Sequence, residues 1–193
     1  MRIVPHILGA AIAAALISTP VFAAELTGTL KKINDSGTIT LGHRDSSIPF
    51  SYIADASGKP VGYSHDIQLA IVEALKKDLN KPDLQTKYNL VTSQTRIPLV
   101  QNGTVDIECG STTNNAARQK DVAFGVTTYI EETKILVKAN SSIHALADLK
   151  GRTVVTTTGT TPLQTLRKQK RAENLSFSEV YGKDHSDSFL LLE

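Results

Sequence analysis

The sequence is poor in the residues that mark disulfide-rich, metal-binding and nucleic-acid-binding proteins. It contains one cysteine, one methionine and no tryptophan, and its 21 basic and 19 acidic side chains nearly cancel. A formal net charge of +2 provides no electrostatic footprint for nucleic acid or for an anionic membrane. His65 and His144 have no partner at the spacing of a metal site, so we expect neither a metal nor a cofactor. Any selectivity for a charged ligand must therefore come from the local placement of side chains.

The short motifs of common catalytic sites are also absent. The sequence holds no Gly-x-Ser-x-Gly elbow, no His-Glu-x-x-His and no phosphate-binding Gly-x-x-x-x-Gly-Lys. Cys109 falls on an expected buried strand and has no evident histidine partner. Catalysis is therefore the less favoured function, although a fold by itself excludes no chemistry.

A long apolar run occurs only at the N-terminus. Arg2 supplies a positive start, residues 7–17 are apolar or glycine, and residues 21–23 (Val-Phe-Ala) offer small side chains for cleavage. This pattern predicts a signal peptide that is removed after Ala23, and therefore export to the periplasm. The run is too short for a membrane anchor, which needs about 20 residues. In an oxidising compartment, Cys109 is expected to be either buried and inert or without its partner.

The remaining chain alternates between strand and helix patterns, which indicates an α/β fold with a largely parallel sheet. The clearest helix has Ser64 as its cap and places apolar side chains on one face: Ile67, Ala70, Ile71, Ala74, Leu75 and Leu79. Further helices are expected at 25–36, at 96–101 with Ser93 as the cap, at 143–150, from Thr161-Pro162, and after Ser186 or Ser188. Strands are expected at 38–41, 85–91, 105–109, 134–138, 153–157 and 175–180. We predict two α/β lobes, 24–126 and 127–193, of which the second is cut short.

Three loops that each follow an expected strand combine hydroxyl groups with an arginine. They are 42–47 with Arg44, 92–96 with Ser93 and Arg96, and 109–115 with Ser111 and Thr113, leading to Arg118. Ligands bind at the carboxyl ends of strands in open α/β sheets, and a guanidinium meets a carboxylate in two parallel hydrogen bonds. Three such loops suggest a ligand with more than one carboxylate. The alternative is that the serines and threonines cap helices and that the arginines lie on the surface.

These loops resemble the glutamate/aspartate-binding proteins of bacterial ABC importers, which are members of solute-binding protein family 3. The resemblance is carried by residues 42–52 (GHRDSSIPFSY), 92–99 (TSQTRIPL), 108–115 (ECGSTTNN) and 183–185 (KDH), and it extends over about residues 30–193. It implies a two-lobed periplasmic binding protein fold of type II. It also implies a monomer without a cofactor that captures L-glutamate or L-aspartate for the membrane permease subunits of an importer.

The resemblance further implies a role for each of eight residues. The ligand's α-carboxylate would be held by Arg118, Thr113 and Thr161, and its ammonium by the backbone carbonyl of Ser111. The side-chain carboxylate would be surrounded by Arg44, Ser93, Arg96 and His185. A threonine at a helix N-terminus suits an anion, because free N–H groups and the helix dipole favour negative charge there. Since Thr161 and His185 belong to the second lobe, the ligand would be clamped by hinge closure.

Members of this family continue past the position of Glu193. The resemblance implies that the rest of the second lobe, an aspartate for the ligand's ammonium and a disulfide partner for Cys109 would lie in that continuation. A truncated chain that binds weakly or not at all is therefore an alternative function, and an enzyme on the same fold is another. A ligand-sensing module of a membrane receptor is disfavoured, because no transmembrane pattern follows the N-terminal run.

Overall fold

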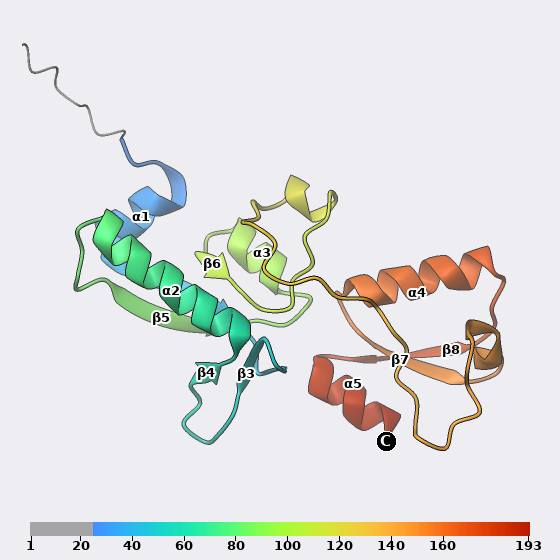
Figure 1. The fold of residues 1–193 in the computed structure, drawn as a ribbon. Coiled ribbons are helices and arrows are strands. Elements are labelled where there is room, and N and C mark those ends of the chain that lie inside the picture. Colours follow the sequence, from blue (N-terminus) through green and yellow to red (C-terminus); the bar gives the residue numbers. More distant parts are fainter. Residues whose placement is uncertain (1–24) are drawn as a thin grey trace, which may run out of the picture.

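The structure, a computed structural model, describes residues 25–193, so the predicted signal peptide lies outside the described residues (Figure 1). The expected α/β architecture is confirmed, and the elements form two groups that face each other in Figure 1. We call them the N-terminal lobe, from α1 to η1, and the C-terminal lobe, from η2 to α5. Among the described residues, no helix has the length and apolar character needed to cross a membrane.

The N-terminal lobe is built on a parallel sheet with the strand order β5-β1-β6. Its elements are α1 (Gly28–Ser36), β1 (Thr38–His43), β2 (Ser46–Ser47), β3 (Ser51–Ile53), β4 (Pro60–Val61), α2 (Tyr63–Asp78), β5 (Gln85–Leu90), α3 (Arg96–Gln101), β6 (Ile107–Glu108) and the short 3-10 helix η1 (Arg118–Lys120). In the register of the sheet, His43 lies opposite Leu90 and Gly42 lies opposite Glu108. The carboxyl ends of all three strands therefore meet at one edge.

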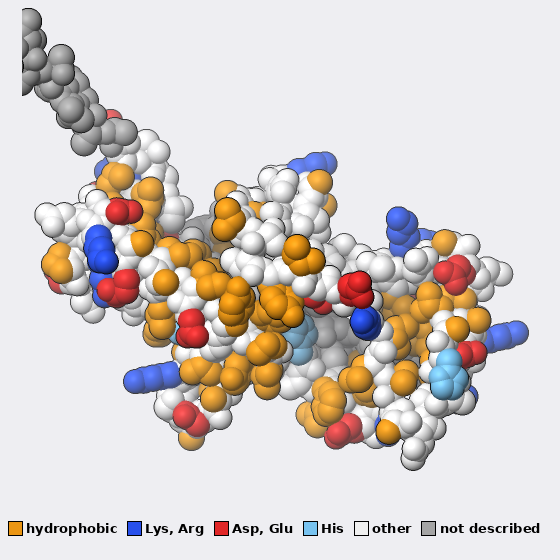
Figure 2. Space-filling view, viewed as in Figure 1, with side chains coloured by type: hydrophobic (Ala, Val, Ile, Leu, Met, Phe, Trp, Pro, Cys, Tyr) orange, Lys and Arg blue, Asp and Glu red, His pale blue; other side chains and the backbone are white. Residues whose placement is uncertain are grey.

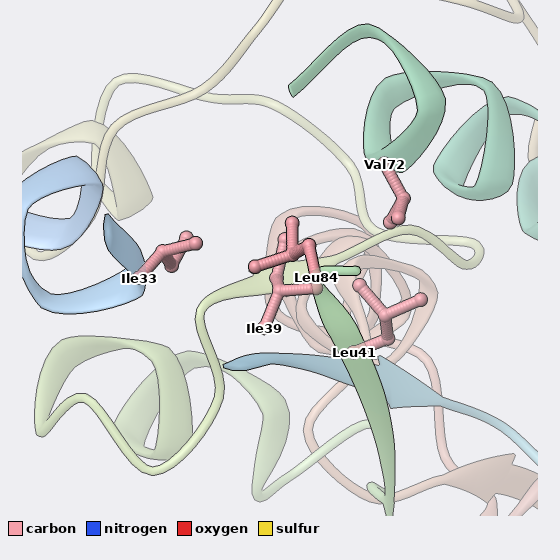
Figure 3. Packing of buried hydrophobic residues seen from close by; sticks show 5 residues of the cluster. All are labelled: Ile33, Ile39, Leu41, Val72 and Leu84. Carbon is pink, nitrogen blue, oxygen red and sulfur yellow. The ribbon is translucent and has the colours of Figure 1, made fainter. Parts of the chain in front are cut away.

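The core of this lobe lies between the sheet and its helices and contains Ile33, Ile39, Leu41, Val72 and Leu84 (Figure 3). The predicted apolar face of α2 is only partly correct. Ala70 and Ala74 are exposed, whereas the polar Gln68 is fully buried. The Gln68 amide nitrogen donates to the carbonyl oxygens of Gly42 and Ile107 at 3.2 and 2.9 Å, so it is satisfied by two strands, whereas Oε1 has no partner.

The C-terminal lobe contains η2 (Leu146–Leu149), β7 (Thr153–Thr157), α4 (Thr161–Ala172), β8 (Ser178–Gly182) and α5 (His185–Leu192). β7 and β8 pair in parallel, and Leu149, Leu166 and Phe177 form a smaller core. The strand predicted at 134–138 is wrong: this segment has no regular structure, and Leu136 is 64% exposed. A strand needs a partner for its backbone hydrogen bonds, and none pairs with this segment among the described residues.

Three of the predicted helix caps are also wrong. Gly62, with φ 120°, is the N-cap of α2, and Ser64 instead donates its hydroxyl to the Gly110 carbonyl at 2.9 Å. Thr95 rather than Ser93 precedes α3. Neither Ser186 nor Ser188 caps α5, because Asp184 accepts from the His185 amide at 2.7 Å. Smaller differences are the reduction of the 143–150 helix to η2 and of the 105–109 strand to β6.

Candidate functional site

The sheet register brings the three arginine-bearing loops to the same edge. Arg44 follows β1, Ser93 and Arg96 follow β5, and Ser111 follows β6. The C-terminal lobe faces this edge through two segments, the β7–α4 turn and the start of α5, which carry Thr161 and His185. The residues predicted to bind therefore come together from five places in the sequence.

Arg44 is fully buried and connects the two lobes. Its Nε donates to Asp184 Oδ2 at 3.2 Å, and its Nη2 pairs with Asp184 Oδ1. Its backbone N–H donates to Ser51 Oγ at 3.0 Å, whereas Nη1 has no partner. Although burial opposes ionisation of Asp184, the hydrogen bonds from Arg44 hold the pKa of that carboxyl below its ordinary value. Partial burial and the nearby Asp184 raise the pKa of Asp45.

A chain of polar contacts runs beside this pair. Ser47 Oγ lies 3.0 Å from His185 Nδ1 and 3.3 Å from Ser111 Oγ, so it joins α5 to the loop after β6. Burial lowers the pKa of His185, and the positive charge of Arg44 lowers it further, while Asp184 opposes the shift. His185 is therefore a neutral hydrogen-bonding group at pH 7.

Arg118 makes the second connection between the lobes. Its Nη1 donates to the Thr113 carbonyl at 2.9 Å, and its Nη2 donates to the Gly159 carbonyl at 3.1 Å. Thr113 Oγ1 and Thr161 Oγ1 lie 3.0 Å apart across the same junction. Thr161 is the first residue of α4, a helix of 12 residues whose N-cap is Thr160. The Arg118 guanidinium, two hydroxyls and a helix N-terminus thus gather at this end of the site.

Arg96 and Ser93, after β5, are buried, with exposed fractions of 2% and 3%. Arg96 Nε and Nη1 and Ser93 Oγ have no hydrogen-bond partner. Burial lowers the pKa of Arg96 to about 10. The charge of Glu108 opposes this shift, and those of Arg118 and Arg44 add to it. A buried guanidinium without a partner is costly, so this end of the site is suited to an anion.

The arrangement can therefore hold an anion with two separate carboxylate groups. The positive charges of Arg44 and Arg118 lie close enough to Arg96 to add to the lowering of its pKa. In residues 25–193, no group of three His, Cys, Asp or Glu side chains could hold a metal ion. Cys109 is half-buried and unpaired, and burial, with the charge of Glu108, raises the pKa of its thiol to about 11. It is a weak nucleophile at neutral pH.

Sequence reasoning missed three residues that the structure places in this site: Ser47, Glu108 and Asp184. Asp184 precedes His185, and Glu108 precedes Cys109, so both lie inside segments that the sequence had already singled out. Their participation depends on how the lobes meet and on which side of β6 faces the arginines. Neither can be inferred from strand and helix patterns.

Comparison with known families assigns the chain. Residues 39–171 match the bacterial extracellular solute-binding proteins, family 3. The chain belongs to this family. Over 193 residues it is 59% identical to the L-glutamate/L-aspartate-binding protein of Pseudomonas aeruginosa. The alignment covers 100% of this chain and 64% of the relative. It is 49% identical over 187 residues to the glutamate/aspartate import solute-binding protein of Escherichia coli. This alignment covers 97% of this chain and 62% of the relative.

Solved structures of other amino-acid-binding proteins have a similar fold. A mutant of ArgBP from T. maritima matches with a TM-score of 0.72 at 24% identity, over 86% of this chain and 67% of that one. The ancestral amino acid-binding protein AncCDT-1, a precursor of cyclohexadienyl dehydratase, also has a TM-score of 0.72 at 24% identity, over 86% and 69%. The predicted fold of a periplasmic binding protein of type II is confirmed. The chain spans less than two thirds of the length of its curated glutamate/aspartate-binding relatives.

Proposed function

We propose that this protein binds L-glutamate or L-aspartate between its two lobes. The observation that carries the proposal is the buried guanidinium of Arg96, whose Nε and Nη1 have no partner. The buried hydroxyl of Ser93, on the same loop after β5, is also unpartnered. A carboxylate is the group that a guanidinium pairs with best, because the two planar groups match in shape and charge. The printed names of the relatives from P. aeruginosa and E. coli support this choice of ligand.

In this proposal the two carboxylates of the ligand occupy different ends of the site. The α-carboxylate lies at the junction of the lobes, held by Thr113, Arg118 and Thr161, and the backbone carbonyl of Ser111 accepts from the ammonium. The side-chain carboxylate lies at the buried end, among Arg44, Ser93, Arg96 and His185. Arg44 can take part through Nη1, since its other nitrogens are engaged by Asp184.

The cellular role follows from the predicted leader and the family. Cleavage after Ala23 would release the protein into the periplasm, where residues 24–126 and 127–193 would act as two lobes that close on the ligand. The closed protein would then deliver the amino acid, as a monomer, to the permease subunits of an ABC importer. The family's description as extracellular solute-binding proteins supports this role, and it favours binding over catalysis.

Calorimetric titration of the purified protein with L-glutamate, L-aspartate and L-glutamine tests the proposal. We expect the two acidic amino acids to bind at least about tenfold more tightly than glutamine, because glutamine leaves a buried guanidinium without its carboxylate. Equal affinity for glutamine would rule out the acidic ligand. No binding up to millimolar glutamate would favour the alternative of a weakly binding or inactive chain.

One contact favours a second candidate function, that of a hydrolase. Ser47 Oγ and His185 Nδ1 are 3.0 Å apart, which is the distance of a nucleophile from its general base. Such a pair also needs a group that orients the histidine and donors that stabilise an oxyanion. Incubation with γ-esters of glutamate separates the two functions. Turnover that disappears in Ser47→Ala would favour the hydrolase, whereas unchanged ester is expected for a binding protein.

A further inference from the structure

Glu108 is a carboxylate that lies among the arginines and has no role in the assignments above. It ends β6 and lies opposite Gly42 of β1 in the sheet. A Cβ atom at Gly110 would lie 2.6 Å from Glu108 Oε1, and one at Gly42 would lie 2.9 Å from Val105 Cγ1 and 3.3 Å from Cβ and Cγ of Glu108. Neither glycine has a positive φ, so the neighbouring side chain, and not the backbone conformation, requires a glycine at these positions. Gly110 leaves a slot for the Glu108 carboxylate, and Gly42 leaves room for the aliphatic part of the same side chain.

Inside this slot the carboxylate is only half satisfied. Oε2 accepts a hydrogen bond from Thr112 Oγ1 at 2.5 Å, whereas Oε1 is buried and has no partner. Within residues 25–193, no lysine, arginine or histidine nitrogen lies within salt-bridge distance of Glu108. Glu108 therefore acts on the arginines through its charge at longer range, in a buried region where that charge is weakly screened.

The effect of this charge is visible on two guanidiniums. Burial lowers the pKa of Arg96 to about 10, and it also lowers the pKa of Arg118. In both cases the negative charge of Glu108 opposes the shift. Glu108 thus stabilises the charged form of two arginines that the proposed function assigns to opposite ends of the ligand.

The site gathers charges of both signs. Arg44, Arg96 and Arg118 contribute three positive charges, and Glu108 and Asp184 contribute two negative ones. Asp45 is a further acidic group at the edge of the site, where partial burial and the nearby Asp184 raise its pKa. His185 is neutral because burial lowers its pKa. An amino acid with two carboxylates and one ammonium carries one negative charge, whereas a simple dicarboxylate carries two.

We infer that Glu108 is a specificity-determining residue whose negative charge favours an amino-acid dicarboxylate over dicarboxylates without an amino group. The inference rests on the proposed function, because it concerns the selectivity of the same site. Without the Glu108 charge, the site would carry one more positive charge, and a doubly negative ligand would gain relative to L-glutamate.

The test compares L-glutamate with glutarate, which is the same dicarboxylate without the amino group. Both are titrated calorimetrically into the unchanged protein, Glu108→Gln and Thr112→Val. Glutamine at 108 keeps an oxygen that accepts from Thr112 but loses the charge, whereas T112V loses the hydrogen bond and keeps the charge. We expect E108Q to shift the affinity ratio toward glutarate by about tenfold or more, and T112V to leave the ratio unchanged.

The outcomes separate this inference from the proposed function. If the unchanged protein does not bind L-glutamate, the proposed function fails. If it binds and E108Q keeps the same ratio, or T112V shifts the ratio as much as E108Q, the role of the Glu108 charge is wrong.

Glu73→Gln removes an exposed carboxylate on α2 and is the matched control. If E108Q does not unfold cooperatively, Glu108→Met replaces it, since it also removes the charge and keeps a side chain of similar length. An unchanged ratio in E108M would then overturn the inference.

Discussion

At the scale of single residues, the two ends of the site are distinguished by what Arg118 and Arg96 contact. Arg118 donates to the Thr113 and Gly159 carbonyls at the lobe junction, whereas two nitrogens of Arg96 are unpartnered.

We expect Arg118→Ala to abolish binding of every amino acid, because all share the α-carboxylate. Arg96→Ala should weaken glutamate and aspartate by about 2–5 kcal/mol and affect glutamine much less. Titration of both variants decides this, with the exposed Arg171→Ala as the control. Normal binding by R118A would disprove the assignment of the α-carboxylate.

Another prediction at this scale concerns pH. Hydrogen bonds from Tyr181, Arg167 and Lys170 lower the pKa of Glu179 from 4.5 to about 2. A carboxyl group with a lowered folded-state pKa stabilises the fold above its unfolded-state pKa, and this stabilisation is lost as the pH falls through the folded-state pKa. Its partners Arg167 and Tyr181 are exposed, so solvent screening limits the effect to about 1 kcal/mol. Glu179→Gln should therefore lower the unfolding free energy at pH 7, and the difference should shrink between pH 4.5 and 2. Denaturant titrations at pH 7, 4 and 3 measure this, and a constant difference would contradict it.

The convergence of the three arginine-bearing loops could be predicted from the sequence because each loop follows a strand, and parallel strands end at one edge. The countercharges could not be predicted in the same way. Asp184 faces Arg44 only because the two lobes meet, and Glu108 faces the site because β6 presents that side chain to the arginines. A sequence pattern specifies which residues end a strand, but it does not specify which carboxylate reaches them from the opposite lobe.

At the scale of elements, the turn between β7 and α4 controls how closely the lobes approach. Gly159 has φ +78°, and a Cβ there would lie 2.6 Å from the Cα of Gln94 in the N-terminal lobe. We expect Gly159→Ala to force the lobes apart, remove the bond from Arg118 to the Gly159 carbonyl and weaken glutamate binding by at least about tenfold. Gly103→Ala is a matched control, because Gly103 has φ +74° but no atom within 4 Å of its Cβ position. Titration and small-angle scattering measure the two effects. Equal losses in both variants would mean that backbone strain, and not lobe contact, is responsible.

Strands that pair with a neighbouring strand were predicted well from the sequence, whereas a segment without a neighbouring strand was not. The strands at 38–43, 85–90 and 153–157 have strand-forming patterns and pair in register. The segment 134–138 has the same kind of pattern, but no strand in the described part of the chain pairs with it. Helix caps failed for a different reason: a cap depends on backbone angles, such as φ 120° at Gly62, that composition does not specify.

At the scale of the whole molecule, the two lobes differ in how completely their apolar surfaces are covered. The C-terminal lobe has a groove of about 850 Å³ lined by residues 133–138, β7, α4 and α5. Hydrophobic side chains lie at the surface of this lobe (Figure 2), and Phe189, Leu190 and Leu191 of α5 are all more than half exposed. Its core is also the smaller of the two, with three buried side chains against five. We infer that the C-terminal lobe has the lower local stability.

This difference predicts that the molecule does not open as a single unit. Amide hydrogens of β7 and β8 should exchange with solvent at least about tenfold faster than those of β1 and β5, because fewer buried apolar contacts oppose local unfolding. Glutamate, if it binds both lobes, should reduce the difference, since a ligand stabilises only the state that it binds. Leu190→Lys, at a side chain that is 66% exposed, should reduce binding of a hydrophobic dye without changing exchange in β1. Hydrogen-exchange mass spectrometry with and without glutamate provides the measurement. Equal protection of the two sheets in the absence of ligand would show that the ion pair between Arg44 and Asp184 and the other contacts between lobes are strong enough to make the protein unfold as one body.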